Sequence, residues 1–278
     1  MDYVELSMTV ADEETAEIIV AELADYPFES FSAEGRDLKA YIPEKELAEC
    51  RADVDKMLGR YGIGGQKYTL IGQRNWNAVW ESDFEPVEID GRVIVRAPFH
   101  EPRPEYGDME LVIMPNMSFG TGHHVTTRLM VETMLGMELK AKQVLDMGCG
   151  TGVLAILAAK SGAAHVDAVD IDEMAFGNCA DNIAANNVAE CISPILGDVG
   201  AVEGRHYDVI VANINRNILL HDMPSYAAML NAGGRIVMSG FLTEDAGAIS
   251  EAARTLDMQE VQRRENEGWT AIEFVKAE

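Results

Sequence analysis

Cysteines are few in this 278-residue sequence, and the four present do not follow the spacing of a metal site or a disulfide framework. We therefore predict reduced thiols that serve packing, and no bound metal ion. No apolar run approaches about 18 residues, the length that a membrane-spanning helix needs. The first ten residues carry acidic but no basic side chains, which argues against a signal peptide. These absences predict a cytoplasmic protein that does not associate with membranes.

Basic residues are also scarce, because 22 lysines and arginines stand against 47 aspartates and glutamates, for a formal net charge of −25. An acidic surface repels phosphate backbones, so we expect no direct binding of nucleic acid. The charge suits a basic protein partner, and solubility alone explains it equally well. Residues 1–70 contain 16 acidic and 7 basic side chains, so this part of the chain shares the acidic character.

The first part of the chain has the pattern of a small α+β domain. Asp12 begins a helix with an apolar stripe, and Pro43 begins a second one. Alternating or compact apolar runs predict four strands, at residues 3–10, 28–33, 38–42 and 68–71. The resulting order, βαββαβ, is typical of a ferredoxin-like fold. We therefore predict a ferredoxin-like N-terminal domain at residues 1–72.

Residues 73–105 are predicted to link this domain to a larger one at residues 106–278. A short helix is expected at the start of the linker, where Trp76 and Trp80 stand one turn apart. Two short strands around Asp90–Gly91 and a stretch with several prolines complete it. We interpret the tryptophans as packing residues, with stacking on a ligand as the alternative.

The larger domain contains a strand, a glycine loop and a helix in immediate succession. Residues 143–147 form the strand, Gly148-Cys-Gly-Thr-Gly152 follows, and the helix starts at Val153. This succession is typical of nucleotide-cofactor sites, because glycines let the backbone approach a ligand closely. The next strand ends at Asp170, 22 residues after the first glycine, where a carboxylate can accept hydrogen bonds from ribose hydroxyls.

The details of this loop separate two classes of cofactor. A nicotinamide site favours the spacing G-x-G-x-x-G, whereas Gly148, Gly150 and Gly152 give G-x-G-x-G. Asp146 stands two residues before the first glycine, where its charge disfavours a pyrophosphate and suits a cationic ligand. S-adenosylmethionine carries a sulfonium and an ammonium group and no phosphate. The loop therefore favours a methyltransferase over a dehydrogenase, and over a glycine turn that binds nothing.

Further strands complete a doubly wound, seven-stranded, Rossmann-like α/β sheet. In such a sheet ligands bind at the carboxyl ends of the strands. Asp198 follows one strand and either meets the adenine or forms a solvated turn. Asn213 follows another, and its amide either accepts a hydrogen bond from a substrate nitrogen or forms an Asx-turn or cap at the start of a helix at residues 217–230; we favour the site role. The six additional strands are predicted at residues 164–169, 192–196, 207–212, 235–239, 257–264 and 269–275.

A second glycine loop, Gly120-Thr-Gly122, precedes a helix that is expected to start near Thr126. Backbone amides and hydroxyl groups at a helix N-terminus bind anions, so the carboxylate of the cofactor is a plausible ligand. His123 and His124 follow the loop, but no further ligand stands at metal-binding spacing. We interpret them as hydrogen-bonded loop residues.

Four segments together resemble the ribosomal protein L11 methyltransferase family. The most specific is Met117-Ser-Phe-Gly-Thr-Gly-His-His-Val-Thr-Thr127, because other methyltransferases lack it. The others are Val144-Leu-Asp-Met-Gly-Cys-Gly-Thr-Gly152, Val211-Ala-Asn-Ile214, and the linker from Trp76 to Pro98. The resemblance covers nearly the whole chain and is weakest over the first seventy residues.

The resemblance implies an enzyme that uses S-adenosylmethionine to methylate lysine side chains and the α-amino group of ribosomal protein L11. The N-terminal domain would hold this basic protein, and the linker would let it swing over the catalytic domain. Another protein or a small-molecule amine is the alternative acceptor. Thr127, Gly148, Asp170 and Asn213 are implied to contact the cofactor. Our complete set of candidate cofactor-binding residues is Phe119, Gly120, Thr121, Thr127, Asp146, Gly148, Gly150, Gly152, Asp170, Ile171, Asp198 and Asn213.

Methyl transfer to nitrogen requires a neutral amine. Neutralising a free lysine at pH 7 costs about 4.6 kcal/mol, because its pKa is about 10.4. A dry cleft beside a positive sulfonium lowers that pKa, and alignment of the nucleophile contributes further. We predict that Asn213 is the catalytic residue and orients the amine.

Overall fold

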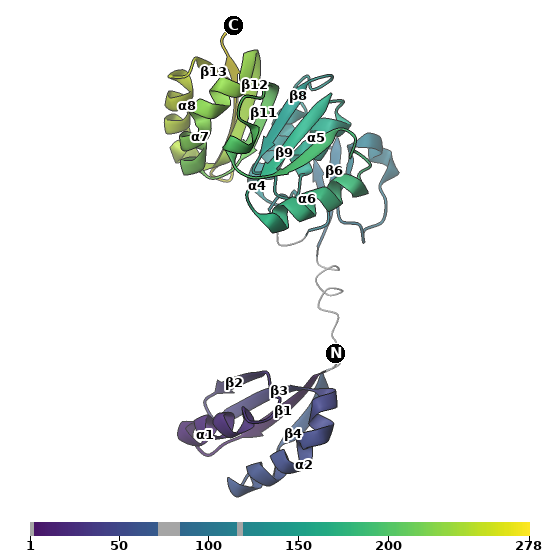
Figure 1. Ribbon diagram of the computed structural model, residues 1–278, viewed down its shortest axis with the longest axis vertical. Helices are drawn as coiled ribbons and strands as arrows, with labels where there is room; N and C mark the ends of the chain where they lie inside the picture. Colours follow the sequence, from purple (N-terminus) through teal and green to yellow (C-terminus); the bar gives the residue numbers. More distant parts are fainter. Residues whose placement is uncertain (1–2, 72–83, 116–118) are drawn as a thin grey trace. The chain divides into compact units, whose positions relative to one another are not determined.

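The computed structural model describes residues 3–71, 84–115 and 119–278, and the chain divides into two compact units, Met1–Phe84 and Glu85–Glu278 (Figure 1). Each unit has an apolar core of its own. The helix expected around Trp76 and Trp80 lies outside the described residues, as do Met117 and Ser118. None of the helices in the described ranges combines the length and apolar character needed to cross a bilayer.

The first unit is a four-stranded antiparallel sheet with two helices on one face. Val4, Leu6 and Met8 are buried because alternate side chains of a strand point to the same face. They share one core with both helices, and Asp12 caps the first helix by accepting the Thr15 N–H at 2.8 Å. The elements are β1 (Tyr3–Thr9), α1 (Glu13–Leu23), β2 (Ser30–Glu34), β3 (Asp37–Pro43), α2 (Glu44–Arg60) and β4 (Lys67–Ile71), in the sheet order β2-β3-β1-β4.

The succession βαββαβ that the sequence predicts is therefore confirmed for this unit. Its classification as ferredoxin-like and its role in holding a substrate stay predictions.

The second unit contains the predicted seven-stranded α/β sheet. Its order is β10-β9-β8-β11-β12-β14-β13, in which the first five strands are parallel and β14 runs antiparallel to both neighbours. The strand order reverses between β8 and β11, and the carboxyl ends of strands at such a switch point form a ligand crevice. The strands are β8 (Gln143–Met147), β9 (His165–Asp170), β10 (Ile192–Leu196), β11 (Tyr207–Asn213), β12 (Leu230–Leu242), β13 (Met258–Asn266) and β14 (Trp269–Lys276).

Helices cover both faces of this sheet (Figure 1). Val144 and Val211 belong to the core shared with α4, α5 and α6, whereas Leu145 and Ile210 belong to the core shared with α7 and α8. Neighbouring strand residues thus face opposite layers, which is why these strands are apolar without alternation. The helices are α4 (Val125–Met134), α5 (Val153–Lys160), α6 (Glu173–Ala185), α7 (Arg216–Met229) and α8 (Ala246–Arg254).

A second, three-stranded sheet precedes the large one. It consists of β5 (Val87–Ile89), β6 (Val93–Arg96) and β7 (Glu110–Val112), with the 3-10 helix η1 (Pro104–Met109) before β7. The two short strands around Asp90–Gly91 are as predicted. Residues 85–105 nevertheless belong to the second unit rather than to a linker, because Val87, Val93 and Val95 are buried in its core.

Candidate functional site

A cavity of about 520 Å³ lies at the carboxyl ends of β8, β9, β10 and β11. This is the position that the strand order predicts for a ligand. Seven of the twelve predicted site residues line it: Phe119, Gly148, Gly150, Asp170, Ile171, Asp198 and Asn213. The other five, Gly120, Thr121, Thr127, Asp146 and Gly152, do not.

The glycines of the loop after β8 make room mainly for other parts of the protein. Gly148, Gly150 and Gly152 have φ values of +70°, +54° and +80°, which only glycine adopts at little cost. A Cβ on Gly148 would collide with Ile214, and one on Gly150 with the Phe119 carbonyl. A Cβ on Gly152 would lie 2.7 Å from the Cys179 sulfur. The glycine motif predicts that all three let a ligand approach, whereas for Gly152 the structure shows close packing of α5 on α6.

Asp170 both lines the cavity and shapes the glycine loop. Its Oδ2 accepts the Gly150 N–H at 2.9 Å, and its Oδ1 accepts the Asp172 N–H at 3.0 Å. Asp172 caps α6 by accepting the Met174 and Ala175 N–H groups. Asp172 lines the cavity as well, so hydrogen bonds hold both carboxylates at its wall, and the exposed Ile171 forms an apolar rim.

Asp146 lies buried beneath the glycine loop, with only 1% of its surface exposed. Its Oδ2 accepts the Ala155 N–H at 2.9 Å, and its Oδ1 has no partner among the described residues. Burial raises the pKa of Asp146 to about 7, with a further contribution from the negative charge of Asp170 and opposition from the Ala155 N–H. The carboxyl group is thus poised to change its charge near neutral pH.

The start of α4 carries a second buried oxygen without a partner. Thr127 Oγ1, in the first turn of the helix, makes no hydrogen bond within the part of the chain that the structure describes. His124 caps the helix, since its Nδ1 accepts the Thr126 N–H at 3.2 Å. His123 lies between the Thr121 hydroxyl and the Glu85 carbonyl, at 3.1 Å from each. Both histidines are therefore hydrogen-bonded loop residues, as interpreted from the sequence, and no metal-binding cluster occurs among the described residues.

Asn213, the last residue of β11, lines the cavity and carries a third buried oxygen, Oδ1, without a partner in the described ranges. The cap of α7 is Asn215, whose Oδ1 accepts the Ile218 N–H at 3.1 Å. The alternative reading of Asn213 as a helix cap is therefore excluded. Asp198, by contrast, fits both readings, because it lines the cavity and its Oδ1 caps the 3-10 helix η2 (Val199–Val202).

A smaller hollow of about 250 Å³ adjoins the cavity and shares three wall residues with it, Phe119, Asn213 and Ile214. The His124 ring lies between Phe119 and Trp269, with centroid distances of 5.0 and 4.9 Å. The remaining lining residues are Thr126, Asn215 and Gly240. The sequence does not indicate that Trp269 lies here, because only the pairing of β14 with β12 brings it to this end of the sheet.

Of the three buried oxygens without partners in the described ranges, Asn213 Oδ1 belongs to the cavity wall and fits a ligand that donates hydrogen bonds, whereas Asp146 and Thr127 lie behind the wall, and the Thr127 hydroxyl can also donate. Each such atom costs about 1–3 kcal/mol when it remains unsatisfied, so a ligand that satisfies it gains that much. S-adenosylmethionine offers an ammonium group and ribose hydroxyls as donors, and its positive charge matches the surrounding carboxylates.

The strand order, the glycine loop after β8 and the carboxylate after β9 define the class of S-adenosylmethionine-dependent methyltransferases. The model of the ribosomal protein L11 methyltransferase family (PrmA) matches residues 4–277, and the chain belongs to this family. The resemblance inferred from the sequence is confirmed.

Named relatives agree with this placement. The chain is 41% identical to a ribosomal protein L11 methyltransferase from Porphyromonas gingivalis, over 94% of this chain and 91% of the relative. It is 40% identical to one from Phocaeicola vulgatus, over 99% of each chain. Among solved structures, the ribosomal protein L11 methylase of Lactobacillus delbrueckii subsp. bulgaricus matches with a TM-score of 0.63 and 26% identity, covering 70% of this chain and all of that one.

Proposed function

We propose that this chain transfers methyl groups from S-adenosylmethionine to ribosomal protein L11, at lysine side chains and at the α-amino group. The observation that carries the proposal is the position of Asn213. Its unpartnered oxygen lies in the wall shared by the cavity and the smaller hollow. A methyl donor in one and an acceptor amine in the other would meet at this residue.

The predicted cofactor-binding residues have distinct roles in this proposal, both those that line the larger cavity and those that lie behind its wall. Thr127 and the N-terminus of α4 hold the carboxylate of the methyl donor, because helix N-termini bind anions. Asp170 accepts from the ribose hydroxyls, and Asp198 meets the adenine. Asp146 balances the positive charge from beneath the loop. S-adenosylmethionine supplies a methyl group on a positively charged sulfur.

The smaller hollow is proposed to receive the acceptor side chain. Phe119 and Trp269 provide apolar walls that exclude water from the amine, which favours its neutral form. Asn213 Oδ1 accepts a hydrogen bond from the amine and so directs the nitrogen lone pair toward the methyl carbon. The bond from carbon to nitrogen forms as the bond to sulfur breaks, and the surplus proton leaves to water.

The charge of the chain supports a basic protein acceptor. The net charge of −25 attracts such a substrate and repels the phosphates of nucleic acids, so we infer no direct binding of RNA. We propose that residues 1–72 hold the substrate and that the reaction takes place in the cytoplasm, where ribosomal proteins are found.

A rate measurement distinguishes L11 from other acceptors. The full-length protein is incubated with S-adenosylmethionine and L11, with another basic protein of similar size, or with free lysine. We expect rapid formation of S-adenosylhomocysteine only with L11. Equal rates with the other protein or with lysine would contradict the proposed specificity.

A further inference from the structure

Three buried asparagines stand one helical turn apart along α6 and its C-terminal end: Asn178, Asn182 and Asn186, with 3%, 1% and 6% of their surface exposed. We refer to them as the asparagine ladder. Side chains four residues apart share a helix face, so the three amides point the same way.

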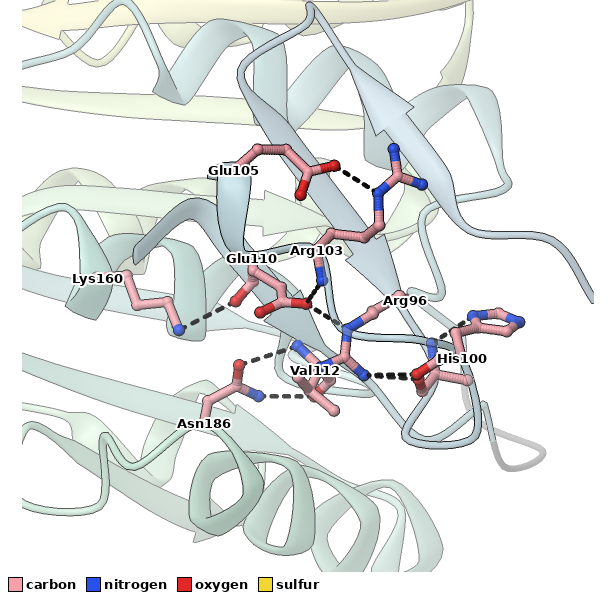
Figure 2. Close-up of polar contacts among 9 residues, drawn as sticks. Arg96, His100, Arg103, Glu105, Glu110, Val112, Lys160 and Asn186 are labelled. Atoms are coloured by element: carbon pink, nitrogen blue, oxygen red, sulfur yellow. Dashed lines mark hydrogen bonds and ion pairs between the residues drawn. The ribbon is translucent and has the colours of Figure 1, made fainter. Parts of the chain in front are cut away.

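The ladder takes the place of a neighbouring strand beside residues 112–114. Asn186 accepts the Val112 N–H at 2.9 Å and donates to the Val112 carbonyl at 2.7 Å (Figure 2). Asn182 accepts the Met114 N–H at 2.8 Å, and Asn178 donates to the Met114 carbonyl at 3.4 Å. The intervening Ile113 N–H points the other way and donates to the Arg96 carbonyl. Alternate backbone groups are thus satisfied as they are within a sheet.

Asn182 differs from Asn186 in where its second amide atom points. Its Nδ2 donates to the Thr151 carbonyl in the glycine loop at 2.9 Å. Thr151 in turn donates its N–H to the Phe119 carbonyl at 2.9 Å and its hydroxyl to the Gly120 carbonyl at 2.7 Å. Asn182 and Thr151 therefore connect Met114 with the residues that lead into the site.

We infer that Asn182 is a positioning residue for the methyl-donor site, which acts through Thr151 to fix Phe119 and Gly120 relative to the glycine loop. The inference rests on the proposed function, because it assumes that the cavity holds the methyl donor. Phe119 lines both the cavity and the smaller hollow. A loosened Thr151 would therefore change the shape of the donor site without removing any residue that touches the donor.

The ladder provides its own matched control. Asn182→Asp keeps the acceptor for Met114 and loses the donor to the Thr151 carbonyl and to Asn178 Oδ1, placing an oxygen against the Thr151 carbonyl. Asn186→Asp keeps the acceptor for Val112 and loses the donor to the Val112 and Asn182 carbonyls, neither of which belongs to the glycine loop. Both variants bury the same new group along one face of α6 and its C-terminal end, so a general loss of stability affects both.

The test is calorimetric titration of the full-length variants with S-adenosylmethionine, beside thermal unfolding of each. We expect Asn182→Asp to raise the Kd at least about tenfold, because it loses a buried hydrogen bond to the glycine loop. Asn186→Asp should change the Kd less than about twofold. Equal increases in both variants, or increases that follow the loss in Tm, would overturn the inference.

Two variants of Thr151 provide a second test that remains decisive if Asn182→Asp does not fold. Thr151→Ala removes the hydroxyl that donates to Gly120, and Thr151→Ser retains it. We expect the alanine variant to raise the Kd and the serine variant to restore most of the affinity. Indistinguishable variants would contradict the role of Thr151. Because the readout is donor binding, failure of L11 methylation with normal binding would overturn the proposed function and leave this inference standing.

Discussion

At the scale of single residues, the charge of Asp146 is coupled to what occupies the cavity. Its folded-state pKa of about 7 lies above the value of about 3.9 expected in an unfolded chain. The folded protein therefore keeps a proton that the unfolded chain releases. The free energy of unfolding of the ligand-free protein should fall as the pH rises from about 4 to 7.

A cationic ligand reverses this preference, because it stabilises the ionised carboxylate. We predict that the Kd for S-adenosylmethionine falls about fivefold to tenfold between pH 6 and pH 8, as Asp146 ionises. Calorimetry in buffers of different ionisation enthalpy should also detect proton release on binding below pH 7. Asp146→Asn should abolish both effects. A variant that retains the wild-type pH profile would show that another group titrates.

Asn213 is the second residue whose role is directly testable. We predict that Asn213→Ala lowers kcat about tenfold to a hundredfold, because misplacement of a nucleophile by an ångström costs that much. A matched control is Asn231→Ala, since Asn231 bonds Asp208 at the opposite end of β11 and lies outside both cavities. Full turnover and unchanged donor affinity in Asn213→Ala would remove it from the mechanism.

At the scale of elements, the junction of α5 and α6 depends on Gly152. Gly204 has the same φ of +80°, but nothing lies within 4 Å of where its Cβ would be. We predict that Gly204→Ala costs about 1 kcal/mol for the backbone strain alone. Gly152→Ala should cost about 1–3 kcal/mol more, because its Cβ meets the Cys179 sulfur.

Urea unfolding of the two glycine variants gives this difference. In a Cys179→Ala background the extra cost of Gly152→Ala should shrink, since the colliding sulfur is gone. An equal cost of both glycine variants would mean that packing of α5 on α6 does not require a glycine here.

The ion pair between Arg96 and Glu110 stabilises the three-stranded sheet (Figure 2). Burial alone would raise the pKa of Glu110, but the Arg103 N–H and the Arg96 guanidinium outweigh it and hold the pKa below its usual value. We predict that Glu110→Gln costs about 2–4 kcal/mol, because it leaves Arg96 buried without its counter-charge. The exposed pair Arg103–Glu105 is the control, and Glu105→Gln should leave the free energy of unfolding nearly unchanged, because solvent screens this pair.

The lowered pKa of Glu110 determines how its contribution to the free energy of unfolding changes with pH. The contribution of Glu110 is present above the pKa of an unfolded glutamate and is lost as the pH falls through the lower, folded value. The difference between wild type and Glu110→Gln in urea unfolding should therefore narrow under acid conditions. A difference that is constant with pH would contradict the role of the ion pair.

The elements that sequence analysis placed well are those with a strong local pattern. The predicted strand at 207–212 differs from β11 only by its last residue, because the four consecutive apolar residues from Val209 to Ala212 mark it. The sequence does not predict the helices α6 and α8 or the strand β7. In α6 the apolar pattern is interrupted by asparagines that form hydrogen bonds with another segment. The hydrogen bond between Asn182 and Met114 joins residues about 70 positions apart in the chain, so a local sequence pattern cannot predict it.

At the site, too, the residues that follow a local pattern are predictable, and those that depend on distant contacts are not. Asp170 and Asn213 were predicted because a strand end fixes their position in the sheet. Trp269 was missed because it reaches the smaller hollow only through antiparallel strand pairing. The role of Gly152 was misjudged because a glycine motif does not say whether ligand or protein occupies the space.

At the scale of the whole molecule, the net charge of −25 should accelerate encounter with a basic substrate. We predict that kcat/KM for L11 falls as salt is raised from about 0.05 to 0.5 M, because screening shortens the range of attraction. The Kd for S-adenosylmethionine should change far less over the same range, because its contacts with the carboxylates of the cavity are shorter than the screening length. A value of kcat/KM that is independent of salt would contradict a role of the net charge in substrate recognition.

The measurement that tests the central claim most directly is mass spectrometry of purified recombinant ribosomal protein L11 after incubation with this protein and S-adenosylmethionine. We predict mass gains in steps of one methyl group, which peptide mapping assigns to lysine side chains or to the α-amino group. No gain in mass, with binding of S-adenosylmethionine intact, would contradict L11 as the substrate and redirect the search to another protein or a small-molecule amine.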